Sequence, residues 1–273
     1  MRVVVFLASL SLALGFSPSR LLDSQTLIVG GVESPMNSRP YQVAILALND
    51  AAGQVCGGTL VHPEWVLSAA HCVGPLNDVW VGVGFHDLRD TAADGATIIT
   101  GQWIKHDKFD PTGTGDHDIA LIKLDQPVVL SNRVQPIPIV SADSDVAWGT
   151  DILISGWGKL SPDDALPSKV LRQVVVTAVR RKHCKNVYTP IGAPVSGNMF
   201  CAAAPGKDSC AHDSGGPAVI GYNENMHVNG VTLAGIVSWG FGCADPVYPG
   251  VYTRISKYCD WISNMSEGDV SCS

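Results

Sequence analysis

Short apolar runs separated by turn residues restrict the possible folds of this chain more than any other feature. Many of the runs are rich in Val and Ile, most are bounded by Gly, Pro, Asn or Asp, and no long 3.6-residue period appears before the C-terminal end. The runs are Gln42–Leu48, Gly57–Val61, Val79–Val83, Ile119–Leu124, Asp151–Ser155, Val170–Val179, Val231–Val237 and Gly250–Ile255. This pattern predicts an all-β fold, either a sandwich or a pair of barrels. We also predict a linker around Leu130–Trp148 and one short helix over Ser256–Asn264, with Ser256 as its N-cap.

The N-terminus has the features of a secretion signal. A charged start precedes the apolar stretch Val3–Phe16, which is too short to span a bilayer and is followed by no second such stretch. Ala13 and Gly15 supply the small residues that a signal peptidase requires. We therefore predict a signal peptide over residues 1–15, an extracellular location and no membrane partner.

The cysteine content agrees with export. The chain has eight cysteines, an even number, so in an oxidising compartment they predict disulfides before metal ligands. No Cys-x-x-Cys motif occurs and the histidines do not stand at zinc-binding spacing from the cysteines, so no metal or other cofactor is expected. Spacing alone leaves the pairing of the cysteines open.

The net charge of the chain disfavours nucleic acid as a partner. The formal net charge is −7 and the pI about 5.5, which argues against a nucleic-acid partner. The length that remains after removal of a leader suffices for one large or two small hydrophobic cores.

Three residues are of the types that form a catalytic serine with its general base and supporting carboxylate. His71 stands between small residues and Cys72, Asp118 precedes an apolar run, and Ser214 precedes two glycines that let the backbone pass close to a substrate. Each alone is more often structural. Together they stand in the order His, Asp, Ser, which is the order of chymotrypsin and not that of subtilisin or the α/β-hydrolases. They are therefore the predicted catalytic triad.

Further motifs in the same order give a family resemblance. From Ile28 to about Asn264 the chain resembles the trypsin/chymotrypsin family of serine proteases. The matching motifs are Ile28-Val29-Gly30-Gly31, Cys56-Gly57-Gly58, Ala69-Ala70-His71-Cys72, Asp118-Ile119-Ala120-Leu121, Gly156-Trp157-Gly158, Asn198-Met199-Phe200-Cys201, Asp213-Ser214-Gly215-Gly216-Pro217 and Ser238-Trp239-Gly240. The resemblance implies two six-stranded antiparallel β-barrels, over residues 28–135 and 136–273, with the active site between them and a short helix at the C-terminal end.

The resemblance also implies three disulfides, Cys56–Cys72, Cys184–Cys201 and Cys210–Cys243. Cys259 and Cys272 are then left over, and we pair them by elimination, because the resemblance does not itself imply that bridge.

Substrate specificity follows from the same match. Asp208 stands six residues before Ser214, where trypsin-like members place an aspartate at the bottom of the primary pocket. A buried carboxylate there favours a guanidinium or an ammonium, so cleavage after Arg or Lys is expected. Ser238 matches the serine that hydrogen-bonds the triad carboxylate. The full predicted set of substrate-binding residues is Asp208, Ser209, Ser238, Trp239, Gly240 and Gly250.

His212 departs from the family pattern. The oxyanion hole is expected to use the backbone N–H groups of His212 and Ser214, but the family normally has glycine at the first position. The His212 ring is expected to crowd bulky substrates and protein inhibitors on the leaving-group side, and a lost oxyanion donor costs about 10²–10³ in rate.

Leu27 is the second departure. The resemblance implies a zymogen with a propeptide over 16–27, whose removal frees the Ile28 ammonium to pair with Asp213. Most members have Arg or Lys before this cut, whereas this chain has Leu27. Cleavage after Arg20, the nearest upstream basic residue, leaves seven extra residues ahead of Ile28. A separate activating protease, or trimming after Arg20, is therefore expected.

The resulting prediction is a monomeric secreted endopeptidase that acts on polypeptides. The alternatives are a protease-fold binding protein that no longer cleaves, favoured only by His212 and Leu27, and an esterase, disfavoured by the order of the triad. The loop Phe85–Thr97 corresponds to one that binds calcium in some trypsins, but Phe85 replaces the first expected glutamate ligand. A solvated acidic loop is therefore expected, with a cation held by Asp87, Asp90 and Asp94 as the alternative. Asp116 and His117 are expected to be ordinary loop residues, and Asn264-Met265-Ser266 is an N-glycosylation sequon.

Overall fold

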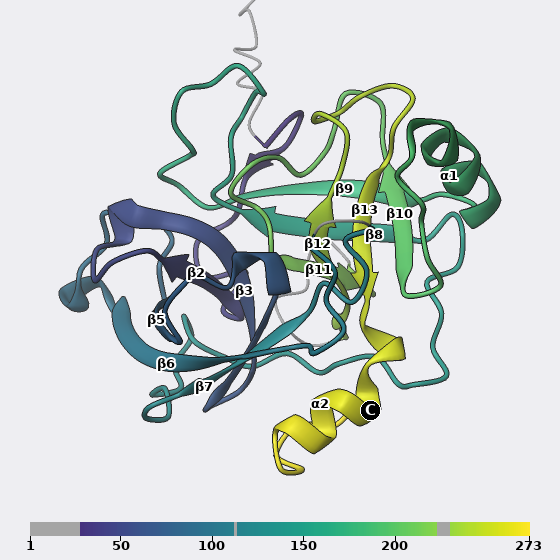
Figure 1. The fold of residues 1–273 in the computed structure, drawn as a ribbon. Coiled ribbons are helices and arrows are strands. Elements are labelled where there is room, and N and C mark those ends of the chain that lie inside the picture. The colour runs from purple at the N-terminus through teal and green to yellow at the C-terminus, as the bar shows by residue number, and fades with distance from the viewer. Residues whose placement is uncertain (1–27, 112–113, 223–229) are drawn as a thin grey trace, which may run out of the picture.

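The structure is a computed structural model that describes residues 28–111, 114–222 and 230–273 (Figure 1). The predicted signal peptide, its cleavage after Gly15 and the propeptide 16–27 lie outside the described residues. Within them, no helix has both the length and the hydropathy that a membrane span requires.

The first barrel is a closed antiparallel ring with the strand order β2-β3-β4-β7-β6-β5. Its strands are β2 (Gln42–Leu46), β3 (Gln54–His62), β4 (Trp65–Ser68), β5 (Asp78–Val83), β6 (Thr97–Lys105) and β7 (Ala120–Leu124). Val, Ile and Leu on the inward faces fill this barrel, and each such side chain contributes about 1.5–3 kcal/mol when it is buried. β4 pairs with β7 so that Ser68 lies opposite Ala120, and this register brings together the chain segments that follow β4 and precede β7.

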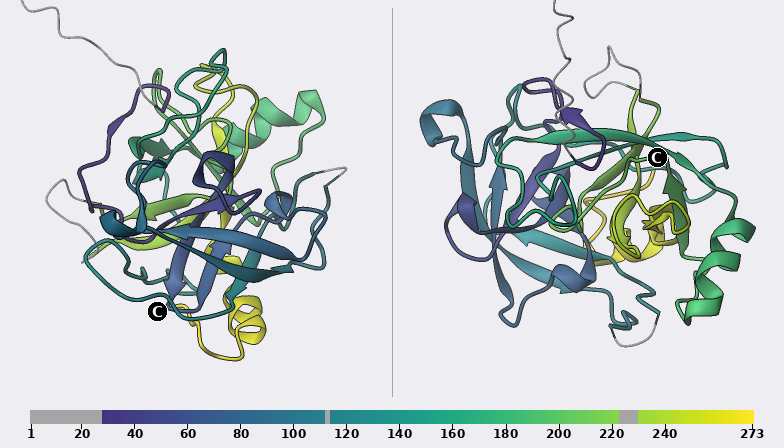
Figure 2. Two further views of the ribbon diagram at one scale, coloured as in Figure 1. Left: turned by 90° about the vertical axis from the view of Figure 1, so that its left-hand side faces the viewer. Right: turned by 90° about the horizontal axis from the view of Figure 1, so that it is seen from above.

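The second barrel is formed by β9-β10-β13-β12-β11-β8, closed by pairing of β8 with β9 (Figure 2). Its strands are β8 (Asp151–Gly156), β9 (Arg172–Ala178), β10 (Met199–Ala203), β11 (Pro217–Ile220), β12 (Thr232–Trp239) and β13 (Gly250–Arg254). The short strand β1 (Val32–Glu33) adds to the outside of this ring through β9. The predicted pair of six-stranded antiparallel barrels is confirmed, while the division of the chain at residue 135 stays a prediction.

A shared core joins the two barrels. It combines buried residues of the first barrel, such as Leu67 and Leu121, with residues of the second, such as Leu153 and Ile236. Ile262 of the C-terminal helix packs into the same cluster. Because this core is continuous, residues contributed by the two barrels keep a fixed relation to one another.

In the described part of the chain, two α-helices lie outside the barrels. α2 (Cys259–Met265) confirms the predicted C-terminal helix, but the prediction of Ser256 as its N-cap was wrong. Ser256 lies in a preceding 3₁₀ turn, Ile255–Lys257, and the helix begins only after Tyr258. The other helix, α1 (Arg181–Tyr188), was not predicted, since its pattern is short and mostly polar. Short 3₁₀ turns complete the structure at Ala51–Gly53, Ala70–Cys72, Ala92–Asp94 and Thr189–Ile191.

All four predicted disulfides are present. They are Cys56–Cys72, Cys184–Cys201, Cys210–Cys243 and Cys259–Cys272, including the pair assigned by elimination. Each closes a loop of the chain, and such closure stabilises a fold by restricting the unfolded state.

Candidate active site

The fold brings His71 and Asp118 together through the register of two strands. His71 lies in the 3₁₀ turn just after β4, and Asp118 lies just before β7, so the antiparallel pairing of Ser68 with Ala120 places both at one end of the barrel. Asp118 Oδ2 lies 2.8 Å from His71 Nδ1, and Asp118 Oδ1 accepts the backbone N–H of His71 at 2.9 Å. The carboxylate thus fixes both the ring and the backbone of the histidine.

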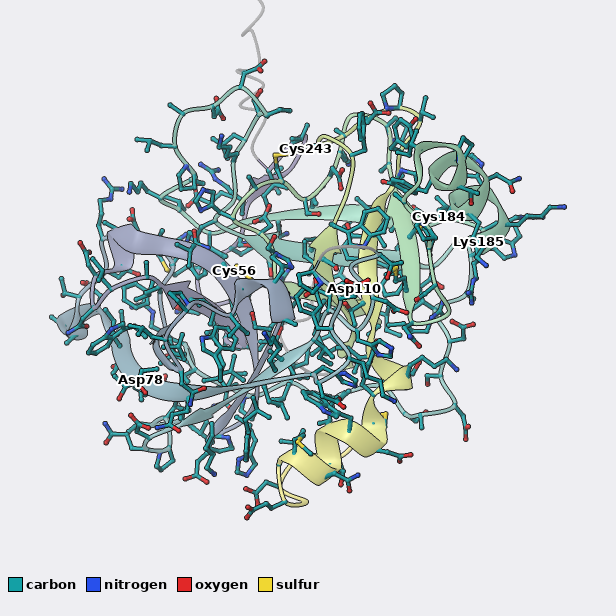
Figure 3. All side chains as sticks on the ribbon, in the orientation of Figure 1. Cys56, Asp78, Asp110, Cys184, Lys185 and Cys243 are labelled. Carbon is teal, nitrogen blue, oxygen red and sulfur yellow. A yellow bond between two sulfur atoms is a disulfide. The ribbon has the colours of Figure 1, made fainter. Side chains whose placement is uncertain are left out.

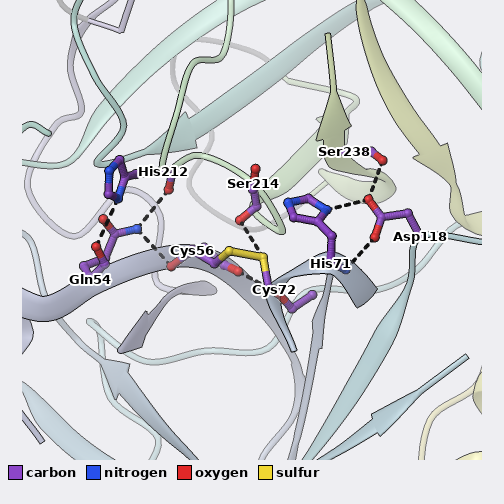
Figure 4. Close-up of a disulfide and its surroundings, with 10 residues drawn as sticks. Gln54, Cys56, His71, Cys72, Asp118, His212, Ser214 and Ser238 are labelled. Carbon is purple, nitrogen blue, oxygen red and sulfur yellow. Dashed lines mark hydrogen bonds and ion pairs between the residues drawn. A yellow bond between two sulfur atoms is a disulfide. The ribbon is translucent and has the colours of Figure 1, made fainter. Parts of the chain in front are cut away.

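The second barrel holds the same carboxylate from the other side. Ser238 of β12 donates its hydroxyl to Asp118 Oδ2 at 2.5 Å, as predicted for that serine (Figure 4). Thr253 of β13 donates to the Asp118 carbonyl at 2.7 Å, a contact that the sequence did not indicate. Asp118 is only 3% exposed, and its hydrogen bonds offset the cost of burying its charge.

Ser214 lies beside the His71 ring (Figure 4). Its carbonyl accepts the Gly57 N–H at 2.7 Å, and the Cys56–Cys72 disulfide passes 3.7 Å from the same oxygen. Among the described residues, no hydrogen bond joins the Ser214 hydroxyl to His71, and such catalytic hydrogen bonds often tighten only when substrate binds. Gly215 has φ of 80°, and a Cβ there would lie 2.3 Å from the Ser68 hydroxyl, so this turn requires glycine.

The backbone at His212 adopts a conformation that is uncommon in residues with a side chain. Its φ is 77°, in the left-handed region that glycine favours and that His tolerates better than most residues. The preceding carbonyl, of Ala211, accepts the Lys159 N–H at 2.9 Å. Because the peptide bond is trans, the His212 N–H points away from Lys159.

Gln54 clamps this residue, which the sequence did not indicate. The Gln54 amide donates to the His212 carbonyl at 2.9 Å and to the Cys56 carbonyl at 2.9 Å (Figure 4). In return, His212 Nδ1 lies 3.2 Å from the Gln54 carbonyl. Gln54 is buried at the start of β3, so both partners of His212 belong to a rigid strand. The His212 ring therefore rests against Gln54.

A cavity of about 270 Å³ connects Ser214 with Asp208. All six predicted substrate-binding residues line it, and Asp208 lies at its buried end; the six are Asp208, Ser209, Ser238, Trp239, Gly240 and Gly250. A Cβ at Gly250 would lie 2.9 Å from Asp208 Oδ1, so glycine keeps the carboxylate accessible. Lys159 and Pro162 also line the cavity and were not predicted.

The charge of Asp208 has no cationic partner among the described residues. Burial raises the pKa of Asp208 to about 6, although the N–H of Ala244 donates to its Oδ2 at 2.9 Å and partly offsets that effect. A guanidinium or ammonium that entered the cavity would favour the ionised form. The cavity is therefore suited to a positively charged side chain.

A second, mostly apolar cavity of about 440 Å³ adjoins the triad. It shares Ser238 and Trp239 with the first cavity and is also lined by His71 and Asp118. Phe109 and Ala193 complete its apolar wall. Nothing in the sequence indicated that these two residues lie beside the triad.

Ile28 and Asp213 are both fully buried. The Asp213 carboxylate accepts the N–H groups of Gly158 at 2.8 Å and Cys210 at 2.9 Å, and burial raises its pKa to about 7. In the uncleaved chain the Ile28 nitrogen is part of a peptide bond, so it carries no charge to pair with Asp213. The segment is already anchored, because the Val29 carbonyl accepts the Asp208 N–H at 3.1 Å.

The loop that binds calcium in some trypsins does not fit a metal here. Phe85 is buried in an apolar cluster, Arg89 pairs with Asp87, and Arg133 pairs with Asp90 at 3.1 Å. Asp90 also accepts the His86 N–H. The expectation of a solvated acidic loop was therefore wrong in part, since arginines neutralise these two carboxylates.

Among the residues that the structure describes, two other clusters have metal-binding residue types. In the first, Cys56 and Cys72 are joined in a disulfide and offer no thiolate to accompany His71. The second cluster consists of His62, Glu64 and Asp269. There Lys123 already lies 3.0 Å from Glu64 and 3.8 Å from Asp269.

The double barrel, the buried His–Asp pair and the adjacent serine define a serine hydrolase of the chymotrypsin class. The family model described as Trypsin matches residues 28–262, and the chain belongs to that family. It is 38% identical to trypsin 5G1 of Aedes aegypti over 251 residues, which cover 90% of this chain and 87% of that protein. It is 37% identical to trypsin of Sus scrofa (88% and 96% covered) and 38% identical to tryptase of Mus musculus (89% and 89% covered). Family membership supports a serine endopeptidase that acts on polypeptides.

Proposed function

We propose that the chain is a secreted endopeptidase that hydrolyses peptide bonds after Arg or Lys through an acyl-enzyme. The observation that carries the proposal is the single cavity that Ser214 and the buried Asp208 both line. A substrate lysine or arginine whose side chain entered this cavity would have its charge near Asp208. The backbone carbonyl carbon of the same residue would then lie near Ser214. Relatives named as trypsins and as a tryptase agree with this specificity.

The chemistry follows from the roles of the triad. His71 takes the proton of the Ser214 hydroxyl as Oγ bonds to the scissile carbonyl carbon, and Asp118 stabilises the imidazolium that forms. The carbonyl oxygen becomes an oxyanion, which the N–H groups of His212 and Ser214 are proposed to bind. The C–N bond then breaks as His71 gives its proton to the leaving amine. Water, deprotonated by His71, hydrolyses the acyl-enzyme and regenerates Ser214.

Specificity is tested with peptide substrates that differ only in the residue before the cut. We expect turnover with Arg and Lys, and at most about 1% of that value with Phe, because a buried unpaired carboxylate rejects an apolar side chain. Asp208→Ser should remove the preference for basic residues while leaving Ser214 reactive. A preference of the unmodified enzyme for Phe would refute the specificity.

Activation is proposed to require a cut before Ile28 and pairing of the new ammonium with Asp213. Both residues are buried, and within the part of the chain that the structure describes the Asp213 carboxylate accepts hydrogen bonds from backbone N–H groups only. Leu27 does not match the proposed specificity, so an activating protease of a different specificity is required. Mass spectrometry of the secreted, active protein should give a chain that begins at Ile28, and an active chain with another N-terminus would refute this step.

Labelling by a fluorophosphonate separates the enzyme from a binding protein of the same fold. The matured protein should label at Ser214 and turn over an arginyl peptide, and Ser214→Ala should do neither. A folded, matured protein that does not label would support the binding-protein alternative.

The matured protein should elute as a monomer on gel filtration. Protein inhibitors are expected to bind more tightly to His212→Gly than to the unmodified enzyme.

A further inference from the structure

Basic residues are concentrated in one segment of this acidic chain. Residues 165–207 contain none of the 25 Asp and Glu residues and seven of the 18 Lys and Arg residues. The seven are Lys169, Arg172, Arg180, Arg181, Lys182, Lys185 and Lys207. Four of them are exposed at and around the first turns of α1: Arg180, Arg181, Lys182 and Lys185. Figure 3 shows Lys185 on α1, at the rim of the molecule.

A cavity of about 330 Å³ opens at the start of this helix. Arg180, Arg181 and Arg254 line it together with Trp148 and Asp145. The Arg180 guanidinium lies over the Trp148 ring, 4.2 Å from its centroid, so the two side chains form one wall. Three arginines therefore line one small cavity.

Arg254 is the buried member of this group. Its side chain is 7% exposed, and its Nη2 donates to the Met199 carbonyl at 3.0 Å. Its Nε has no acceptor among the described residues, and burial lowers the pKa of Arg254. Its ion-pair partner is Asp145, whose side chain is 73% exposed. An exposed surface carboxylate thus neutralises a buried cation, and an external anion could replace it.

We infer that this cavity and the cations of α1 form a binding site for a sulfated polysaccharide. One sulfate group would enter the cavity and pair with Arg254 and Arg180, displacing Asp145. The remaining sulfates would follow the exposed face of α1 over Lys182 and Lys185. A sulfate suits the site because it stays ionised and offers several oxygens to guanidinium donors.

The surface fits a polysaccharide better than other polyanions. Arg180 covers a face of Trp148, the aromatic ring on which a nucleic-acid base would stack. The exposed residues of α1 are polar or charged, so the helix offers no apolar anchor of the kind that protein partners use. None of the residues that line this cavity lines the cavity between Ser214 and Asp208, so binding would retain the protein on a polyanion and leave the catalytic cleft open.

The test measures binding of heparin, as the sulfated probe, to the full chain with Ser214→Ala, which prevents self-cleavage. We expect binding that weakens steeply as salt increases. The variant Arg180→Gln/Arg181→Gln/Lys185→Gln should bind at least about tenfold more weakly. The matched control Lys105→Gln/Lys108→Gln/Lys257→Gln loses the same charge at exposed positions elsewhere and should change binding less than about twofold. Absent binding, or equal losses in both variants, would overturn the inference.

A second pair of variants tests the cavity itself. Asp145→Asn frees Arg254 and should strengthen heparin binding several-fold, whereas Asp143→Asn, an equal charge change two residues away on the surface, should have little effect. Equal effects of the two would show a diffuse charge effect and overturn the role of the cavity. Hyaluronan, which has carboxylates only, and polyglutamate should bind much more weakly than heparin. Equal binding of polyglutamate would overturn the polysaccharide assignment in favour of an acidic protein partner.

Discussion

Replacing Gln54 with Met removes the amide that holds the His212 carbonyl but keeps the length and approximate volume of the side chain. Two hydrogen bonds are lost, to the carbonyls of His212 and Cys56, each at 2.9 Å in the structure. Each contributes about 0.5–1.5 kcal/mol. The left-handed conformation of His212 costs about 1–2 kcal/mol in a residue other than glycine. The two quantities are similar, so without the amide the peptide at His212 should leave its catalytic orientation in most molecules.

The expected effect is on the chemical step. If only about one molecule in 10 to 100 retains the orientation, kcat falls about 10- to 100-fold, which corresponds to about 1.4–2.7 kcal/mol in the barrier. This stays below the effect of deleting an oxyanion donor outright, about 10²–10³. KM for an arginyl peptide should change little, since Asp208 and its cavity make no contact with the Gln54 side chain among the described contacts.

A double-mutant cycle provides the control. Glycine adopts φ of 77° without strain, so His212→Gly in the Gln54→Met background should restore most of the lost kcat. Benzamidine binding, which reports the cavity at Asp208, should stay unchanged in all four proteins and so exclude misfolding. The reasoning is refuted if Gln54→Met keeps its kcat within about twofold, or if His212→Gly gives no recovery.

Three other predictions concern charge. Burial raises the pKa of Asp208 to about 6, so benzamidine binding to His71→Ala should level off above pH 7 and weaken about tenfold for each pH unit below 6; a flat profile would contradict the assignment. Burial raises the pKa of Asp213 to about 7 from an ordinary value of 3.8, so the folded precursor keeps a proton that the unfolded chain releases. Urea unfolding should show the precursor losing up to a few kcal/mol of stability as the pH rises from about 4 to 7. Asp213→Asn should remove the Asp213 part of this loss and leave the smaller part due to Asp208, and the loss should be smaller in the matured enzyme. Finally, because Arg133 pairs with Asp90 in the loop, the Tm should be the same in calcium and in EDTA, whereas Arg133→Gln should lower it by several degrees.

The sequence predicts those features that depend on local pattern or on matched motifs. Valine- and isoleucine-rich runs between turn residues indicated the strands, and the order His71, Asp118, Ser214 indicated the triad. The meeting of His71 with Asp118 depends on the pairing of Ser68 with Ala120, a register that apolar alternation does not specify, because β4 and β7 are buried along almost their whole length.

The sequence did not indicate the polar contacts between residues that are far apart along the chain. Gln54 and His212 are 158 residues apart, and neither local pattern nor periodicity shows that an amide in β3 meets a strained turn in the second barrel. Arg254 is similar, because a basic residue at the end of a strand gives no sign that it is buried in a cavity with Arg180. The short helix α1 also depends on tertiary contacts, since the Cys184–Cys201 disulfide and burial of Tyr188 hold it in place.

The two departures from the family pattern have different physical consequences. His212 puts a side chain where the backbone needs a positive φ, and the chain offsets that strain within the site, because Gln54 binds both the carbonyl and the ring of the same residue. Leu27 lies outside the described residues, and its proposed effect falls on the choice of an activating enzyme. Position 212 should therefore be interpreted together with position 54. A histidine at 212 without a hydrogen-bonding side chain at 54 would predict a weak oxyanion hole, whereas the pair found here predicts a working one.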